Sequence, residues 1–271
     1  MFGENMVDYE GVEDTLFIPL TARINISKKF PEYFYDEEAL KLENIVANKL
    51  IEEKSSEYHL LASVARYYNF DEITQKFINK NTESNIINLG VGLETSYFRL
   101  DRKDSIFYEV DLPEVIKLRR DLIGENENEF LISGDLFKIG WMERIDKFKP
   151  TLIIASGVFQ YFHEEEIIKI IKLIQENFDN AEIIFDATNR NGLKFANRYV
   201  QKTGNESAIM YFYVNDGKEF AKKTNSTLIE QRPFFIDARK ILSKKIEFMT
   251  KILMWSGDLL NTTRIIHLKL E

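Results

Sequence analysis

The sequence contains no cysteine among its 271 residues, and this absence removes several kinds of chemistry. Without thiols the chain can form no disulfide, no zinc–thiolate site and no iron–sulfur cluster, and it has no cysteine nucleophile. Histidine is scarce as well. His59, His163 and His267 lie far apart and lack the i, i+4 spacing that places two imidazole rings on one helix face. We therefore expect no catalytic metal.

The sequence also lacks a positive charge excess and any long apolar run. Its 36 Lys and Arg are outnumbered by 44 Asp and Glu, so the net charge is −8. This balance predicts no general attraction to nucleic acid or to anionic membranes, although it leaves room for a local basic patch. No apolar run approaches the ~18 residues that span a bilayer, and residues 1–11 do not resemble a signal peptide. We expect a cytoplasmic protein whose partner is a small molecule, not nucleic acid or a membrane.

The first third of the chain reads as helical. Apolar residues recur at spacings of three and four over residues 36–50 and again over 58–78, which is typical of amphipathic helices. From residue 85 the sequence pattern changes to short β-branched runs separated by helical patterns. The clearest helical pattern is at residues 164–178. The expected strands are residues 85–89, 105–110, 130–132, 151–155, 181–187, 227–231 and 263–270. Such alternation predicts a mostly parallel sheet with helices on both faces.

The end of the chain completes this expectation. Residues 188–202 and 238–254 read as helices, and the last strand alternates its side chains, which suits an antiparallel strand near a sheet edge. We interpret the chain as one α/β domain. An N-terminal helical cap, residues 1–84, precedes a Rossmann-like core, residues 85–271, and an insert at about residues 205–225 is expected to act as a lid.

A glycine turn follows the first expected strand. Gly90 and Gly92 permit a tight turn and let a ligand approach the backbone. The dinucleotide fingerprint requires a third glycine where this chain has Thr95, so the turn better suits an adenosyl nucleoside without a pyrophosphate. Asp111 then ends the second strand, where an acid accepts hydrogen bonds from ribose hydroxyls. Alternatively, the glycines serve only packing, and Asp111 and Glu114 cap the helix that begins at Pro113.

Two further strands end in polar turns. Asp135 and Leu136 follow the third strand, where the carboxylate could accept from an adenine amino group and the leucine could pack on the ring. Ser156 follows the fourth strand and could face the same ligand. Ligands of open α/β sheets bind at the carboxyl ends of the strands, which favours this interpretation. Because Gly and Asp are common in turns, a purely structural role remains the alternative.

Two adjoining blocks are more specific than these glycines: NLGVGLET at residues 88–95 and YEVDLPEVI at residues 108–116. With shorter matches at residues 15–20, 186–197 and 266–270, they make the chain resemble the leucine carboxyl methyltransferase family from residue 14 onward. Within that family it is most similar to the branch of tetracenomycin polyketide synthesis O-methyltransferases. The resemblance implies a class I methyltransferase fold, with a seven-stranded sheet that is parallel except for one strand. It also implies S-adenosyl-L-methionine as the cofactor.

The resemblance also implies roles for particular residues. It places Arg66, with Arg23 as a second candidate, against the methionyl carboxylate of the donor, a group that a guanidinium matches in shape and charge. Many relatives carry Glu where this chain has Ser156. A carboxylate contact to the donor's ammonium group is therefore either missing here or supplied by another residue.

The expected activity is O-methyl transfer to a hydroxyl or carboxyl group of a small molecule, such as a polyketide-like aromatic. His163 is the one histidine near the expected ligand edge and is a candidate base, although a cap of the helix at residues 164–178 is the favoured role. Aromatic residues at 211–213 and 233–235 could line the acceptor pocket or belong to the core. Three alternatives stay open: methylation of a protein's C-terminal carboxylate, donor binding without catalysis, and a nicotinamide-dependent oxidoreductase.

Overall fold

The computed structural model describes residues 13–46, 56–203 and 209–271. The segment 1–11 therefore lies outside the described residues. The same holds for the end of the expected helix at 36–50 and for the start of the expected insert at 205–225. Within the described residues, no helix combines the length and apolar character that a bilayer span requires. No group of three or more His, Asp and Glu residues is placed there so that it could hold a metal ion.

Helices form the N-terminal cap. They are α1 (Glu13–Lys29), α2 (Glu37–Lys41), α3 (Glu43–Val46) and α5 (Glu57–Lys80). The pattern at 36–50 predicted one helix, but its described part forms two short ones. The helices are separated by a turn at Leu42, whose N–H donates to the Ala39 carbonyl, three residues back, at 3.1 Å. The side chain of Asp36 begins α2 by accepting a hydrogen bond from the Ala39 N–H at 2.9 Å.

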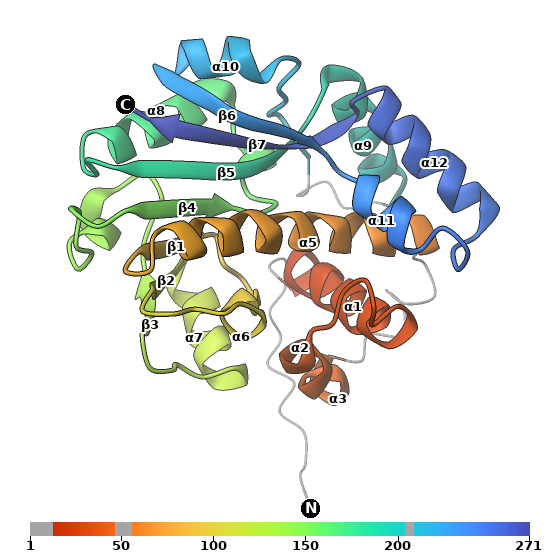
Figure 1. Ribbon diagram of the computed structural model, residues 1–271, viewed down its shortest axis with the longest axis horizontal. Coiled ribbons are helices and arrows are strands. Elements are labelled where there is room, and N and C mark those ends of the chain that lie inside the picture. The colour runs from red at the N-terminus through yellow and green to blue at the C-terminus, as the bar shows by residue number, and fades with distance from the viewer. Residues whose placement is uncertain (1–12, 47–55, 204–208) are drawn as a thin grey trace, which may run out of the picture.

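The seven strands form one sheet in the order β3-β2-β1-β4-β5-β7-β6, as Figure 1 shows. The strands are β1 (Asn85–Leu89), β2 (Ile106–Asp111), β3 (Glu129–Ser133), β4 (Thr151–Ala155), β5 (Ala181–Thr188), β6 (Ser226–Pro233) and β7 (Thr263–Leu270). β7 runs antiparallel to both β5 and β6, and the neighbouring pairs among β1 to β5 are parallel. The expected fold class is confirmed, and β7 lies one place inside the sheet edge.

Helices cover both faces of the sheet. α5 crosses one face in front of β1 and β4 (Figure 1), and α8 (Glu164–Gln175) packs on the other. Along β1, Ile86 belongs to the core on the α5 side and Ile87 to the core on the α8 side. This alternation is the two-residue period of a strand. The remaining helices are α6 (Ser96–Arg99), η1 (Ile139–Met142), η2 (Phe159–Tyr161), α7 (Pro113–Leu122), α9 (Arg190–Thr203), α10 (Gly217–Lys223), α11 (Ile236–Ile241) and α12 (Phe248–Leu259).

One further helix differs from the expectations, and another is unusually short. The single helix expected at 238–254 is two, because the chain turns after Leu242 and buries both Leu242 and Ile246 before α12 begins. The helix that follows the glycine turn, α6, is only four residues long. It ends because Leu100 adopts an extended conformation and turns into the core.

Candidate functional site

A cavity of about 590 Å³ lies at the carboxyl ends of β1, β2, β3 and β4. The turns that follow these four strands contribute to its lining, together with residues of α1 and α5. Its volume falls within the ~300–1,000 Å³ of typical small-molecule sites. The cavity therefore lies where an open, mostly parallel sheet binds its ligands.

Glycine is required at two points of the turn after β1. Gly90 and Gly92 both have positive φ, +61° and +52°. A Cβ at Gly90 would lie 2.6 Å from a methyl group of Val158, and one at Gly92 would lie 2.8 Å from a methyl group of Leu16. Both positions thus combine a backbone conformation that L side chains rarely adopt with a close approach. The turn presents bare backbone to the cavity.

Asp111 is fixed beside this turn. Its Oδ2 accepts the Gly92 N–H at 2.8 Å, and its Oδ1 accepts the Leu112 N–H at 2.7 Å. A carboxylate offers about four acceptor positions, so each oxygen keeps capacity for a hydroxyl donor. Burial raises the pKa of Asp111 above its ordinary value. The geometry suits a vicinal diol that approaches along the cavity wall.

A cation reaches the cavity from α5. The Nη1 of Arg66 lies 3.4 Å from the Oδ2 of Asp186, at the end of β5. The other oxygen of Asp186 accepts the Gly157 N–H at 2.6 Å. Burial acts to lower the pKa of Arg66, but the Asp186 carboxylate, together with the nearby Tyr67 hydroxyl, raises it, and the pKa stays above its usual range. Arg66 therefore stays charged and can receive an anionic group.

Ser156 supplies an unsatisfied polar group in the same region. It lines the cavity, and its buried hydroxyl has no hydrogen-bond partner in the described part of the chain. The Nε of Arg66 is buried and unpaired in the same sense. Buried polar atoms without partners cost stability unless a ligand or water satisfies them. Both positions therefore fit a polar ligand.

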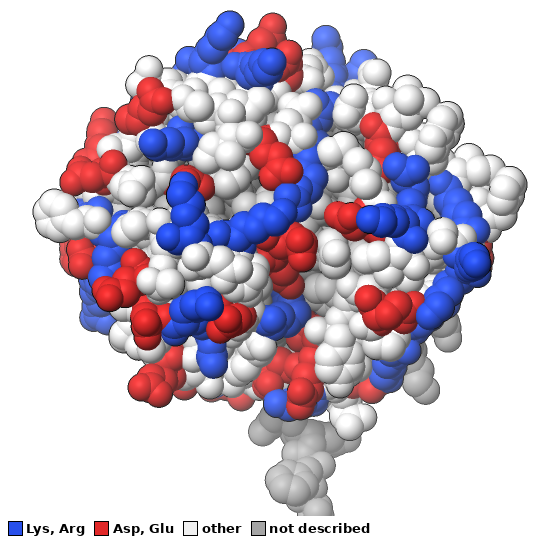
Figure 2. Space-filling model, viewed as in Figure 1, with Lys and Arg blue, Asp and Glu red and all other residues white. Residues whose placement is uncertain are grey.

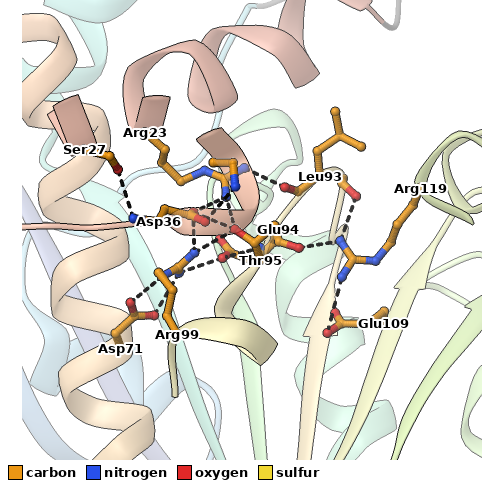
Figure 3. A network of polar contacts seen from close by, with 12 residues as sticks. Arg23, Ser27, Asp36, Asp71, Leu93, Glu94, Thr95, Arg99, Glu109 and Arg119 are labelled. Atoms are coloured by element: carbon orange, nitrogen blue, oxygen red, sulfur yellow. Dashed lines mark hydrogen bonds and ion pairs between the residues drawn. The ribbon is translucent and has the colours of Figure 1, made fainter. Parts of the chain in front are cut away.

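Arg23 lines the cavity, but its polar contacts are to the protein. Its Nη1 donates to Asp36 Oδ2 at 2.8 Å and to the Thr95 hydroxyl, and its Nη2 donates to the Leu93 carbonyl at 2.5 Å (Figure 3). The side chain is fully buried. Arg23 therefore ties the N-terminal helices to the glycine turn, and its role toward the donor stays a prediction.

Arg99 joins the same buried network from α6. It contacts Asp36 at 2.8 Å, Glu94 at 2.7 Å and both oxygens of Asp71, at 2.7 and 3.0 Å. Burial acts to raise the pKa of Asp36, but Arg99 and Arg23 lower it to about 2. For Asp71 burial prevails over Arg99 and raises the pKa to about 6. Figure 3 shows how these charges from α2, α5 and α6 converge behind the turn.

Asp135 and Leu136 both line the cavity, on the loop after β3. The Asp135 carboxylate accepts the Phe137 N–H at 3.0 Å and lies 3.3 Å from the Nζ of Lys138. The Phe137 N–H, followed by Lys138, lowers the pKa of Asp135. Asp135 therefore stabilises the turn through these contacts. Its contact with an adenine stays a prediction.

His163 is the N-cap residue of α8, and its N–H donates to the Glu166 carboxylate at 2.8 Å. Its exposed ring lies 4.5 Å from the ring of Tyr211, and it is not among the residues that line the cavity. The helix-cap interpretation is confirmed, and the role as base stays a prediction without a contact to the cavity. Phe212, Phe234 and Phe235, expected as alternatives in the acceptor pocket or in the core, lie in the core.

The aromatic residues that do line the cavity are different ones: Tyr67, Phe137, Tyr161 and Phe162. The ring of Tyr67 faces three guanidinium groups, with Arg23 at 5.0 Å, Arg66 at 5.3 Å and Arg99 at 5.8 Å from its centroid. Sequence reasoning missed Tyr67 and Asp186 as members of this site. The available signals were that Tyr67 directly follows Arg66 and that Asp186 lies near the carboxyl end of a strand.

Comparisons with known proteins agree with this geometry. The family model for leucine carboxyl methyltransferase matches residues 23–175. The tetracenomycin polyketide synthesis O-methyltransferase TcmP of Streptomyces glaucescens is 22% identical over 85% of this chain and 88% of its own length. Leucine carboxyl methyltransferase 1 of Bos taurus is 28% identical over 44% of this chain and 47% of its own length. The structure of magnesium protoporphyrin IX methyltransferase from Synechocystis PCC 6803 with bound S-adenosylhomocysteine shares the fold, with a TM-score of 0.52 over 87% of this chain, all of that chain and 11% identity.

Proposed function

Because this chain belongs to the leucine carboxyl methyltransferase family and is an S-adenosyl-L-methionine-dependent methyltransferase, we propose that it methylates an oxygen atom of a small-molecule acceptor. The observation that carries the proposal is the cavity of about 590 Å³, which joins polar groups suited to the donor with an aromatic wall. The relation to the polyketide O-methyltransferase favours an aromatic hydroxyl or carboxyl acceptor.

The residues present fit the donor. Asp111 has free acceptor capacity for the two ribose hydroxyls beside bare glycine backbone. Arg66 offers a held, charged guanidinium for the methionyl carboxylate. The unpaired Ser156 hydroxyl offers a further hydrogen bond to the donor. When bound, S-adenosyl-L-methionine supplies an electrophilic methyl group on a sulfonium.

The chain's own task is then to position the acceptor and exclude water. Leu16 and Pro19 of α1 cover the cavity from the N-terminal side, while Phe137, Tyr161 and Phe162 form an apolar wall. A carboxylate acceptor needs no base, whereas a phenol, with a pKa of about 10, benefits from one near neutral pH. We propose that positioning supplies most of the rate enhancement, with the N-terminal helices as part of the acceptor cover.

The insert expected to act as a lid enters this proposal only through its edge. Its described part, residues 209–225, places Phe212 and Phe220 in the core on the α8 side. The N–H of Tyr211 donates to the carbonyl of Gln160, a cavity residue, at 2.7 Å. The insert can therefore support the cavity wall.

A methyl-transfer assay tests the proposal. Purified protein is incubated with methyl-labelled S-adenosyl-L-methionine and, in separate reactions, with phenols, aromatic carboxylic acids and a peptide that ends in a free leucine carboxylate. We expect label on a phenol or aromatic acid. Transfer to the peptide alone would instead support the protein-directed activity that the family name describes.

Two variants make the assay specific. Asp111→Ala should lower transfer about 10- to 100-fold at a subsaturating donor concentration. Glu114→Ala should leave transfer unchanged, because Glu114 is an exposed acid that does not line the cavity. Donor binding without transfer to any acceptor would contradict the proposed activity and favour a binding protein.

A further inference from the structure

Helix α12 turns its large apolar side chains outward. Seven of them between residues 248 and 260 are 40–76% exposed: Phe248, Met249, Ile252, Leu253, Trp255, Leu259 and Leu260. We call these seven residues the α12 face. Their spacing of one, three and four residues places them on one side of the helix. Single exposed apolar residues are ordinary, but a contiguous set of this size marks a contact surface.

The residues on the inward side of α12 explain why the helix is oriented in this way. The buried residues of the helix are Thr250, Met254 and Gly257. A Cβ at Gly257 would lie 3.3 Å from the ring of Phe235, so the helix packs closely at this residue. A larger side chain would have no room there. The helix is thus built to leave its α12 face available.

Basic residues lie on α9, whose start packs against Thr262 just after α12, and on residues 239–251, which lead into α12. Helix α9 exposes Arg190, Lys194 and Arg198 at four-residue spacing, next to Phe195, which is 71% exposed. None of these three basic side chains forms an ion pair within the described residues. The same holds for Lys240 of α11, Lys244 before α12 and Lys251 in α12. Figure 2 shows uncharged surface on the right of the molecule, over α12, bordered by a run of Lys and Arg.

The charge of this region is opposite to that of the whole chain. Residues 190–203 and 236–262 together contain nine Lys and Arg against three Asp and Glu, a net +6 in a chain of net −8. Two of the three acids, Asp237 and Glu247, form no ion pair in the described structure, and the third, Asp258, pairs with Arg239 at 2.9 Å. Because salt screens charges beyond about 8 Å, a surface in contact senses the local excess rather than the total.

The α12 face lies at the same end of the sheet as the cavity, namely at the carboxyl ends of the parallel strands. The side chain of Asn189, between β5 and α9, donates to the Leu260 carbonyl at 3.0 Å, and its N–H donates to the Thr262 carbonyl at 3.0 Å. These contacts hold the end of α12 at the carboxyl end of β5. The cavity lies at the carboxyl ends of β1 to β4.

We propose that the α12 face, with the basic side of α9, docks on the surface of an anionic lipid bilayer. Phe, Trp and Leu on one side with Lys and Arg at the border is the pattern of helices that lie in the bilayer interface. The surface does not insert as a span, and the net charge of the chain gives no general attraction. If the proposed function holds, docking brings the cavity to acceptors that are anchored to or dissolved in the bilayer.

Vesicle sedimentation of the full chain tests the proposal. The probes are vesicles of phosphatidylcholine alone and vesicles of equal parts phosphatidylcholine and phosphatidylglycerol, at low and at high salt. We expect binding to the anionic vesicles that weakens with salt and is at least about tenfold weaker on neutral vesicles. The assay needs neither donor nor acceptor, so its failure is distinguishable from failure of the proposed methyl transfer.

Matched variants identify the surface. Trp255→Ser with Leu259→Ser, and separately Lys194→Gln with Arg198→Gln, should each reduce binding to anionic vesicles at least about tenfold. The apolar control is Phe148→Ser. Phe148 is 83% exposed and lies on the loop before β4, at the amino ends of the parallel strands and so opposite the cavity. The charge control is Lys117→Gln with Arg144→Gln, both exposed. Both controls should bind as the original protein does.

Several results would overturn the proposal. They are absence of vesicle binding, binding that both surface variants retain, and equal losses in the control variants. Size-exclusion chromatography supplies the remaining one. A dimer that Trp255→Ser with Leu259→Ser converts to monomers, without vesicle binding, would assign the face to a second copy of the chain. Unchanged S-adenosyl-L-methionine binding by each variant shows that it is folded.

Discussion

Replacing Asp36 with asparagine tests whether the buried charge network holds the glycine turn. Asp36 is fully buried, and its Oδ2 contacts Arg23 and Arg99 at 2.8 Å each and accepts from the Thr95 hydroxyl at 2.6 Å. Asparagine keeps the size and can still cap α2. It leaves two buried guanidinium groups short of one negative charge, a loss that typically costs about 3–5 kcal/mol.

The pKa of Asp36 gives an independent magnitude. A shift from the ordinary 3.8 to about 2 corresponds to about 2 kcal/mol of stability. Because this pKa is depressed in the folded state, the contribution is fully present above about pH 4 and is lost as the pH falls toward 2. We therefore expect Asp36→Asn to lower the free energy of unfolding at pH 7 by about 2–5 kcal/mol.

Urea unfolding at pH 7 measures this change. The matched control is Glu38→Gln on the same helix, because Glu38 pairs at 2.7 Å with an exposed lysine, Lys41, and such pairs contribute only about 0–1 kcal/mol. Since Arg23 and Arg99 also contact Leu93, Glu94 and Thr95, the variant should bind S-adenosyl-L-methionine more weakly as well. A loss below about 1 kcal/mol, or one equal to that of the control, would refute the reasoning.

Three further predictions concern single residues. Burial raises the pKa of Glu109 to about 7, so the native protein loses stability as the pH rises from about 4.5 to 7; Glu109→Gln should remove this slope and raise the free energy of unfolding at pH 8 by up to about 3 kcal/mol, as measured by urea unfolding. Gly157→Ala should weaken donor binding in calorimetry, because a Cβ there would lie 2.5 Å from the end of the Arg66 side chain, and it should lower Tm, because alanine is strained at a φ of +69°. Arg66→Lys should weaken S-adenosylhomocysteine binding by about tenfold or more and leave adenosine binding unchanged, since adenosine lacks the carboxylate that the planar guanidinium matches; equal losses for both ligands would contradict the assigned role.

The sheet could be predicted from the sequence because its signal is local. Each central strand is a short buried run of β-branched residues that ends in a turn, and residues 85–89, 151–155 and 263–270 were predicted with the bounds that the structure has. The order of strands and helices also predicts that the ligand site lies at the carboxyl ends of the strands, where Gly90 and Asp111 are found.

What the sequence could not show depends on tertiary contacts. The break between α11 and α12 arises because Leu242 and Ile246 both turn into the core, and helical spacing does not reveal such a turn. Arg23 was expected at the donor, yet it contacts Asp36 and Thr95. These partners are separated from it by 13 and 72 positions in the sequence, so local patterns do not reveal the contacts. The pattern of α12 indicates an apolar side but not that this side faces outward.

Calorimetric titration tests the central claim that an adenosyl donor binds at the carboxyl edge. The ligands are S-adenosyl-L-methionine, S-adenosylhomocysteine and NAD, and the proteins are the original chain, Asp111→Ala and Glu114→Ala. We predict saturable binding of the two adenosyl ligands only, weakened about 10- to 100-fold by Asp111→Ala because hydrogen bonds to a charged group are lost, and unchanged in Glu114→Ala. Preferential binding of NAD, or adenosyl binding that Asp111→Ala leaves intact, would contradict the account.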